Sequence, residues 1–361
     1  MNNRKTGLFL AAACLSLTLL TGCSAESTKN YKQAAQDLEN GNYEVALEEY
    51  EAAISAGVKP AQSYRGAGVA QLKLGNYDEA VTYFSNALDC DKVGKALKKD
   101  ILSYRAAAYL KLKEYEEAMA DCQALAESYN MDADLYFLTG ETALAMDSYE
   151  EASSNFEQAY GEDATYDRAL QIYGAYLDKD MEADGTRYLE AALSGNAKNA
   201  QDHCDRGRVY YYMDDYENAT AELKQAIDGD NTEALALLGM VYMDQGDSAN
   251  ARTMFQQYVS QAENGAKGFN GLALCDIEDG DYDSALSNIS SGIHVADAED
   301  MQSLLFNEIA VYEKLDFQTA LQKANEYLGL YPDDKTVKKE LAFLKTRVSG
   351  EDSSADSQLS D

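Results

Sequence analysis

A short motif recurs nine times along this chain, and its recurrence limits the possible folds more than any other feature of the sequence. The first copy reads Gly41-Asn42-Tyr43, followed by Ala46 and Tyr50. Successive copies lie 32 to 38 residues apart, and such a period predicts stacked units that pack only on their neighbours. The later copies begin, in chain order, at Gly75, Lys113, Asp147, Asp180, Asp214, Gly246, Gly280 and Leu315.

Each copy predicts two helices joined by a tight turn. After the first turn, Ala46 and Ala53 lie two helical turns apart with Tyr50 between them, and this small–large–small face lets two helices interlock. The turn residues are mostly Gly, Asn and Asp, which tolerate left-handed backbone. The first helices carry a small residue where we expect the second helix to cross closely: Ala34, Gly68, Ala106, Gly140, Gly207, Gly239 and Ala273.

Composition favours the same helical interpretation. Hydrophobic residues make up 46% of the 361, yet only 2 are Pro. Proline interrupts helices and is common in turn-rich β-proteins, so its near absence favours long helical runs over a β-sandwich.

The period and residue pattern resemble the tetratricopeptide repeat (TPR), a helix–turn–helix unit that stacks into a solenoid. The resemblance covers residues 27–334 and implies an all-α, right-handed solenoid of about nine repeats. The chain departs from the family pattern in having no Trp and, at repeat ends, only Pro332. The fifth copy is degenerate, with uncertain boundaries in 178–200, and residues 91–100 predict a lengthened turn or helix end.

Two segments follow the ninth copy. Residues 335–348 predict an amphipathic capping helix with Val337, Leu341 and Leu344 on one stripe, because the last apolar face of a solenoid needs a cover. Residues 349–361 are polar and acidic, and we expect a disordered tail there.

The N-terminal segment predicts export and anchoring. Arg4 and Lys5 precede an apolar run too short to span a bilayer, which is typical of a secretory signal peptide over 1–22. The run ends Leu20-Thr21-Gly22-Cys23 and resembles the lipobox of bacterial lipoproteins. This resemblance implies that Cys23 becomes the lipidated (diacyl, palmitate-type) N-terminus, followed by a linker over 23–30, on the extracytoplasmic face of the cell membrane. The alternative is an ordinary signal peptide with a chance cysteine.

The charge of the chain excludes one class of partner. Lys and Arg number 30 against 63 Asp and Glu, for a net charge of −33, which becomes −35 once Arg4 and Lys5 are removed with the leader. Neutralising a phosphate backbone requires clustered Lys and Arg, so we expect no nucleic-acid binding.

No arrangement of residues predicts catalysis, a metal or a cofactor. His203 and His294 have no second ligand at helical spacing, and the acidic runs coincide with repeat turns. Four mature cysteines besides Cys23 have no histidine partner and are expected to be free, mostly buried thiols: Cys90, Cys122, Cys204 and Cys275.

The TPR resemblance implies that the first helices line a concave groove that holds a partner's peptide or loop. Within the run Tyr210-Tyr211-Tyr212 we expect Tyr210 in the core and Tyr211 in the groove, because consecutive helical residues point about 100° apart. Such a groove favours partners with apolar anchors and basic flanks. Projection of the family pattern places these residues towards it: Arg65, Lys73, Phe137, Glu141, Arg208, Tyr211, Met240, Met243, Asp244 and Asn270.

Three functions remain compatible with the sequence. The first is a membrane-anchored scaffold that binds other proteins of the bacterial cell envelope. The second is a solute- or glycan-binding lipoprotein of an uptake system, although zero Trp removes the usual surface for sugar stacking. The third is an enzyme or enzyme subunit, which the missing catalytic residues disfavour.

Overall fold

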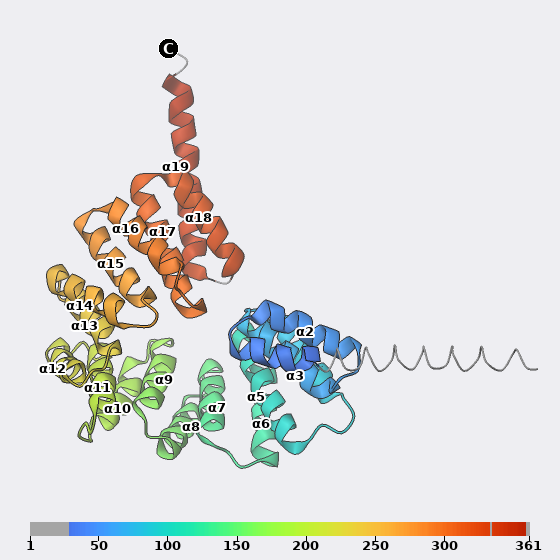
Figure 1. Ribbon diagram of the computed structural model, residues 1–361. Helices are drawn as coiled ribbons and strands as arrows, with labels where there is room; N and C mark the ends of the chain where they lie inside the picture. The colour runs from blue at the N-terminus through green and yellow to red at the C-terminus, as the bar shows by residue number, and fades with distance from the viewer. Residues whose placement is uncertain (1–28, 333, 359–361) are drawn as a thin grey trace, which may run out of the picture. The chain divides into compact units, whose positions relative to one another are not determined.

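The computed structural model describes residues 29–332 and 334–358, and within these ranges the chain consists of α-helices joined by turns and short loops (Figure 1). No strand occurs in these ranges, which confirms the all-α prediction. The signal peptide and Cys23 lie outside the described residues. No helix in the described part is long and apolar enough to cross a bilayer.

The first compact unit ends at Gly185. Its described part begins with a helix over 29–39. The helices that follow alternate as second and first members of successive repeats: α2 (Tyr43–Ser55), α3 (Pro60–Lys73), α4 (Tyr77–Leu88), α5 (Lys95–Leu112), α6 (Tyr115–Ser128), α7 (Ala133–Ala145), α8 (Tyr149–Glu162) and α9 (Tyr166–Leu177).

The second compact unit begins at Thr186, within α10 (Glu182–Ala192). The division of the chain therefore falls in the second helix of the degenerate fifth copy. The remaining helices of this unit are α11 (Ala200–Tyr212), α12 (Tyr216–Asp228), α13 (Glu233–Asp244), α14 (Ser248–Gln261), α15 (Ala266–Asp279), α16 (Tyr282–Ile293), α17 (Ala298–Leu315), α18 (Phe317–Leu330) and α19 (Lys335–Gln358).

The turns inside the first eight repeats each have a residue in the left-handed conformation that the sequence predicts. At the second turn, Gly75 has φ +79° and the N–H of Asn76 donates to the carbonyl of Gln71 at 2.9 Å, as in a Schellman ending. The ninth turn differs because Leu315 still belongs to α17. The other copies all begin on a residue of positive φ: Gly41, Gly75, Lys113, Asp147, Asp180, Asp214, Gly246 and Gly280.

Close helix crossings occur at the small residues that the sequence singled out. A Cβ added to Gly68 would come within 2.6 Å of Phe84, and one on Gly140 within 2.7 Å of Phe156. The same relationship joins Gly239 of α13 to Phe255 of α14, at 2.5 Å. These glycines let each first helix approach the large residue in the middle of its partner helix.

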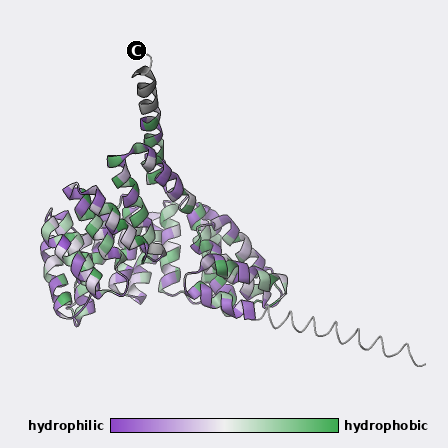
Figure 2. Cartoon of the chain, turned by 45° about the horizontal axis from the view of Figure 1, so that its top comes forward, coloured by the Kyte–Doolittle hydropathy of each residue, from purple (hydrophilic) through white to green (hydrophobic). Residues whose placement is uncertain are grey.

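The core is a series of clusters built from successive helices. One cluster in the second unit combines Leu223 of α12 with Leu238 and Val241 of α13. Tyr242 packs against this cluster and also against the next one, which contains Phe255. Figure 2 shows hydrophobic and hydrophilic residues on the helices of both units, as expected where every helix buries one stripe.

At one boundary the structure agrees with the sequence prediction of a lengthened turn or helix end, and at another it differs. The extra residues near 91–100 divide between a loop and an α5 of 18 residues, compared with 14 in α3. The capping helix α19 buries Val337 and Leu344 completely, but it continues to Gln358. Residues 349–358 are therefore helical where we expected a disordered tail, while 359–361 lie outside the described residues.

The four cysteines are free thiols, and Cys122, Cys204 and Cys275 are buried as predicted. Burial raises the pKa of the Cys204 and Cys275 thiols to about 11, which keeps them in the unreactive protonated form. His203 lies 2.6 Å from a carboxylate oxygen of Glu222, which itself accepts from Arg206 at 2.8 Å. This histidine therefore contacts the Arg206–Glu222 ion pair, which joins α11 to α12.

Candidate partner-binding site

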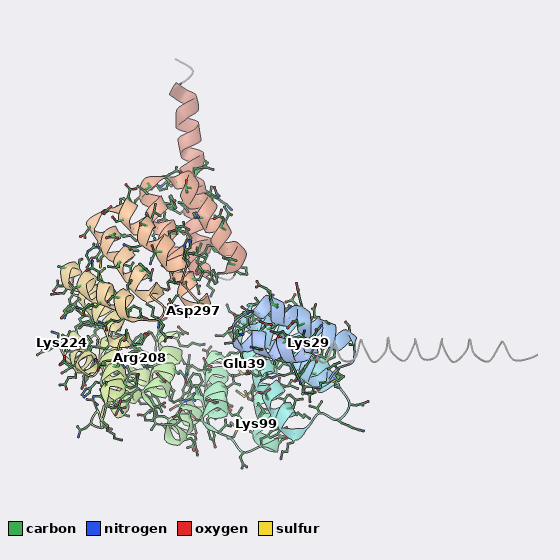
Figure 3. All side chains as sticks on the ribbon, viewed as in Figure 1. Lys29, Glu39, Lys99, Arg208, Lys224 and Asp297 are labelled. Atoms are coloured by element: carbon green, nitrogen blue, oxygen red, sulfur yellow. The ribbon has the colours of Figure 1, made fainter. Side chains whose placement is uncertain are left out.

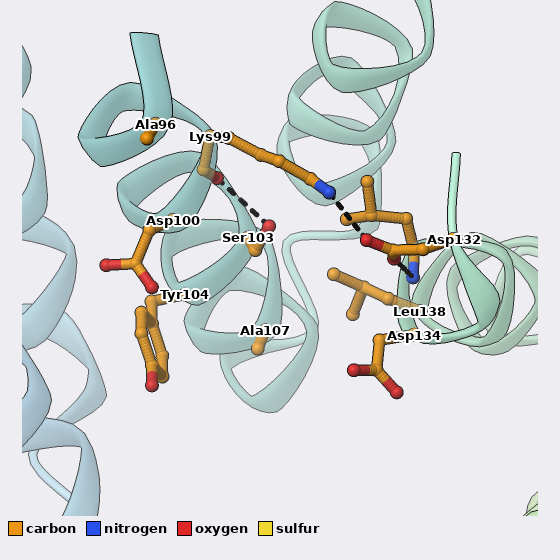
Figure 4. Close-up of a pocket in the computed structure, with 10 residues that line it drawn as sticks. Ala96, Lys99, Asp100, Ser103, Tyr104, Ala107, Asp132, Asp134 and Leu138 are labelled. Atoms are coloured by element: carbon orange, nitrogen blue, oxygen red, sulfur yellow. Dashed lines mark hydrogen bonds and ion pairs between the residues drawn. The ribbon is translucent and has the colours of Figure 1, made fainter. Parts of the chain in front are cut away.

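A pocket opens between the first helices of the third and fourth repeats, in the first unit. Its volume is about 430 Å³, within the range of small-ligand or side-chain pockets. Figure 4 shows the Lys99 side chain reaching from α5 to Asp132, just before α7. We call it the unit 1 pocket, and its lining residues are Ala96, Lys99, Asp100, Ser103, Tyr104, Ala107, Asp132, Asp134, Leu135 and Leu138.

Lys99 and Asp132 close one side of the unit 1 pocket. The Lys99 ammonium donates to Oδ2 of Asp132 at 2.5 Å, and Oδ1 of Asp132 accepts from the N–H of Leu135 at 3.1 Å. Burial opposes ionisation of Asp132, but the hydrogen bonds from Lys99 and Leu135 outweigh it and lower the pKa of that carboxyl. The same side chain thus caps α7 and ties it to α5.

The other two carboxylates of the pocket are held by arginines from neighbouring first helices. Arg65 of α3 donates to both oxygens of Asp100, at 2.6 and 3.1 Å. Arg168 of α9 donates to Asp134 and lies 5.1 Å from the ring centre of Phe137. Each carboxylate therefore links two repeats and has a cationic partner, which fixes the pocket walls before any ligand arrives.

The unit 1 pocket can accommodate an apolar side chain of a bound partner, with polar groups around its rim. Small side chains at Ser103 and Ala107 leave room, and Leu135 and Leu138 provide apolar contact. The paired charges at the rim offer hydrogen-bonding groups without a large net charge. No residue here forms a nucleophile–base pair, since Ser103 Oγ donates to the carbonyl of Lys99 at 3.0 Å.

The second unit has a pocket of different character between α15, α17 and the start of α19. It measures about 380 Å³ and is lined by amides, hydroxyls and the exposed ring of Phe306. Asn307 donates to Oδ1 of Asn270 at 2.7 Å, so amides join consecutive first helices here. The hydroxyl of Tyr327 donates to Asp334 at 2.6 Å.

The ten residues projected towards a groove occupy varied environments. Lys73, Met240 and Asp244 are exposed, and the other seven are half-buried. Asn270 lines the pocket of the second unit, and none of the ten lines the unit 1 pocket. Figure 3 locates Arg208 on α11, where its guanidinium lies 3.1 Å from Asp205 on the same helix.

Two projected residues of the first unit lie half-buried on α7. The Phe137 ring lies 5.7 Å from that of Phe156, so it packs between the two helices of the fourth repeat, α7 and α8. Burial raises the pKa of the Glu141 carboxyl, although Lys111 opposes the shift.

Tyr211 and Met243 are packing residues of the second unit. The Tyr211 ring packs on the cluster around Leu223, and its pKa is raised by burial and by a hydrogen bond to Asp244. Sδ of Met243 lies 3.3 Å from Sγ of Cys275. Within the tyrosine run, Tyr210 and Tyr211 are both half-buried, and Tyr212 is the exposed member, at 48%.

The unit 1 pocket was missed by the projection, although the repeat register contains a signal for it. Asp100 and Asp134 each lie six residues before the small crossing residue of their helix, Ala106 and Gly140. Equivalent positions in consecutive first helices lie side by side in a stacked repeat. Acidic residues at the same repeat position in two consecutive first helices therefore indicate that these helices form the walls of one pocket.

A tetratricopeptide-repeat family model matches residues 31–95, 204–267 and 237–290. Tetratricopeptide repeats are present in these matched ranges. The matched ranges include the first two helix pairs and the run from α11 to α16. TPR units generally act as non-catalytic scaffolds that bind proteins. In the described ranges no cluster of three or more His, Cys, Asp or Glu residues could hold a metal ion.

Curated relatives match about half of this chain. RNA polymerase II-associated protein 3 of Xenopus laevis is 27% identical in an alignment of 203 residues that covers 51% of this chain and 30% of that protein. The human protein of the same name is 26% identical over 180 residues, covering 45% of this chain and 26% of its own length. The chain thus spans about a third of the length of these relatives or less.

Solved structures with a similar fold include other repeat proteins. A tetratricopeptide repeat protein from Parabacteroides merdae has a TM-score of 0.44 and 18% identity, covering 69% of this chain and 98% of its own. A human IFIT1 dimer has a TM-score of 0.49 and 18% identity, covering 88% of this chain and 80% of its own.

Proposed function

We propose that this protein is a lipid-anchored scaffold on the extracytoplasmic face of a bacterial cell membrane, where it binds a segment of another envelope protein through its TPR first helices. The observation that carries the binding proposal is the unit 1 pocket. Its walls come from two consecutive first helices and are fixed by ion pairs that each cross a repeat boundary.

The pocket dictates the chemistry of the segment that it binds. An apolar side chain fills the space beside Ala107 and Leu138, and polar backbone of the segment meets the rim at Asp132 and Asp134. The side chain of Asp134 is 87% exposed, so one of its oxygens is accessible to a donor. Basic residues beside the apolar anchor add attraction, since the chain as a whole carries −33.

The membrane part of the proposal is supported by the sequence Leu20-Thr21-Gly22-Cys23 after a basic and apolar leader. A diacyl modification of Cys23 supplies two chains, which is enough for stable anchoring. Labelling cells with a fatty-acid analogue tests it: the wild-type protein takes up label and a Cys23→Ser variant does not. Equal labelling of the variant excludes Cys23 as the anchor.

The binding part is tested by filling the unit 1 pocket. Ser103→Arg places a long side chain in the pocket, whereas Ser154→Arg makes the same change on α8 at an exposed position. Partners are cross-linked in intact envelopes and recovered with each variant. We expect Ser103→Arg to lose the partner and Ser154→Arg to keep it, with equal thermal stability. Unchanged recovery with Ser103→Arg excludes this pocket as the binding site.

A further inference from the structure

The outer face of the capping helix carries a row of positive charge on an otherwise acidic protein. Residues 335–349 contain five basic residues and one acidic residue, while the whole chain has a net charge of −33. Lys335, Lys339, Phe343 and Arg347 follow one another at four-residue spacing, so they lie along one face of α19. All four are exposed. We call this row the basic stripe.

An exposed aromatic ring interrupts the basic stripe near its end. Phe343 is 41% exposed. Its ring lies 6.5 Å from the ring of Phe317, the first residue of α18. The guanidinium carbon of Arg347 lies 4.9 Å from the Phe343 ring centre. An aromatic ring covered by an arginine is a common anchor in protein interfaces.

Neighbouring acids are already engaged within the second unit. Glu340 is half-buried and hydrogen-bonded to Glu313 of α17. Asp316 accepts from the N–H groups of Gln318 and Thr319, where it caps α18. Acidic residues return in the sequence at Glu351 and Asp352, beyond the side chains that the structure describes.

We infer that the basic stripe is a second interaction surface, which binds an acidic protein segment with an apolar side chain seated on Phe343. The positive charge of the stripe favours a negatively charged partner, and the exposed Phe343 ring supplies a contact that does not depend on salt. The stripe lies on the capping helix and is separate from the first-helix pocket of the proposed function. The two surfaces prefer partners of opposite charge.

An anionic membrane is a poorer occupant of the same face. Insertion of an amphipathic helix into a bilayer requires its apolar side, but Val337 and Leu344 are fully buried against α17 and α18. The rest of this acidic chain is also repelled by an anionic leaflet. The stripe therefore has the charge but not the apolar surface of a membrane-binding helix.

The test uses the full chain lacking its leader and a fluorescent peptide in which glutamates surround one phenylalanine. We expect saturable binding that weakens as salt is added. Reversing two charges of the stripe, Lys339→Glu with Arg347→Glu, should weaken binding about tenfold. The control Lys32→Glu with Lys98→Glu makes the same change of net charge at exposed positions in the first unit and should leave binding unchanged.

Further arms separate the alternatives. Phe343→Ala should also weaken binding, and the binding that remains should depend more strongly on salt. Thermal denaturation of each variant checks that α19 stays docked. A peptide with lysine in place of glutamate should not bind the stripe. Equal affinity of the wild type and the reversal variant, no saturable binding, or stripe-dependent binding to anionic phospholipid vesicles without peptide binding would overturn the inference.

Discussion

Arg65 of α3 holds Asp100 of α5 through two hydrogen bonds, of 2.6 and 3.1 Å, and so joins two successive repeats. The same guanidinium lies 4.9 Å from the ring centre of Tyr104. Both charged side chains are partly exposed, so water screens their attraction. The link nevertheless fixes Asp100 in the wall of the unit 1 pocket.

A double-mutant cycle measures this link. Arg65→Gln and Asp100→Asn should each lower the free energy of unfolding by about 1 kcal/mol. The double variant should lose little more than either single variant, with a coupling energy of about 1 kcal/mol from urea denaturation. Strictly additive losses would show that the two groups do not interact in solution.

The crossing at Gly239 should tolerate no side chain. A Cβ there would lie 2.5 Å from the Phe255 ring, so Gly239→Ala should destabilise the second unit by about 2 kcal/mol. Phe255→Leu makes room, and we expect the alanine variant to cost less in that background. If the cost of Gly239→Ala is the same with leucine at 255, contact with the ring is not its cause.

Lys113 occupies a turn position better suited to glycine. Its φ is +63°, and left-handed backbone costs a residue with a Cβ about 1 kcal/mol. Lys113→Gly should therefore raise the free energy of unfolding by roughly 0.5–1 kcal/mol, and Gly75→Ala, at the equivalent position, should lower it. Chemical denaturation of both variants checks the opposite signs.

Docking of the capping helix should depend on pH. Burial and the hydrogen bond to Glu340 raise the pKa of Glu313 from 4.5 to about 7. The folded state therefore keeps a proton that the unfolded state loses above pH 4.5, and its stabilisation is lost as the pH rises through 7. Solvent screening limits the effect to about 1 kcal/mol. Hydrogen exchange of α19 amides, corrected for intrinsic rates, should be faster at pH 8 than at pH 5.

Glu313→Gln is the matched control for this effect. An amide keeps a donor for Glu340 and cannot ionise, so the extra opening at pH 8 should disappear. Persistence of the same pH dependence in this variant would assign it to another group.

Unfolding should proceed in two blocks. The division between the compact units falls at Gly185, inside the degenerate fifth copy, and contacts in repeat proteins are mainly local. Hydrogen exchange in moderate denaturant should show one set of rates before this copy and another after it, changing within residues 178–200. A single cooperative exchange rate for the whole chain would contradict this.

Backbone features were predictable from the sequence, and the pocket was not. The repeat period and residue size alone predict the close crossing at Gly68 and the turn at Gly75, because a close crossing or a left-handed turn allows few residue types. The pocket depends on which cation reaches which acid, as with Arg168 and Asp134, and long side chains have many rotamers. In the tyrosine run, one helical step of about 100° separates the half-buried Tyr211 from the exposed Tyr212, and the binding role of Tyr211 stays a prediction.

The hydrogen bonds that end each first helix come from residues of the same repeat, as with Asn76 and Gln71. Deletion of one repeat, from a turn residue to the equivalent residue of the next turn, would therefore leave the hydrogen bonds of the remaining turns intact. Gene duplication or loss can thus change the length of this protein by whole modules. The two surfaces proposed to bind partners would then move apart or together without redesign of the parts that remain.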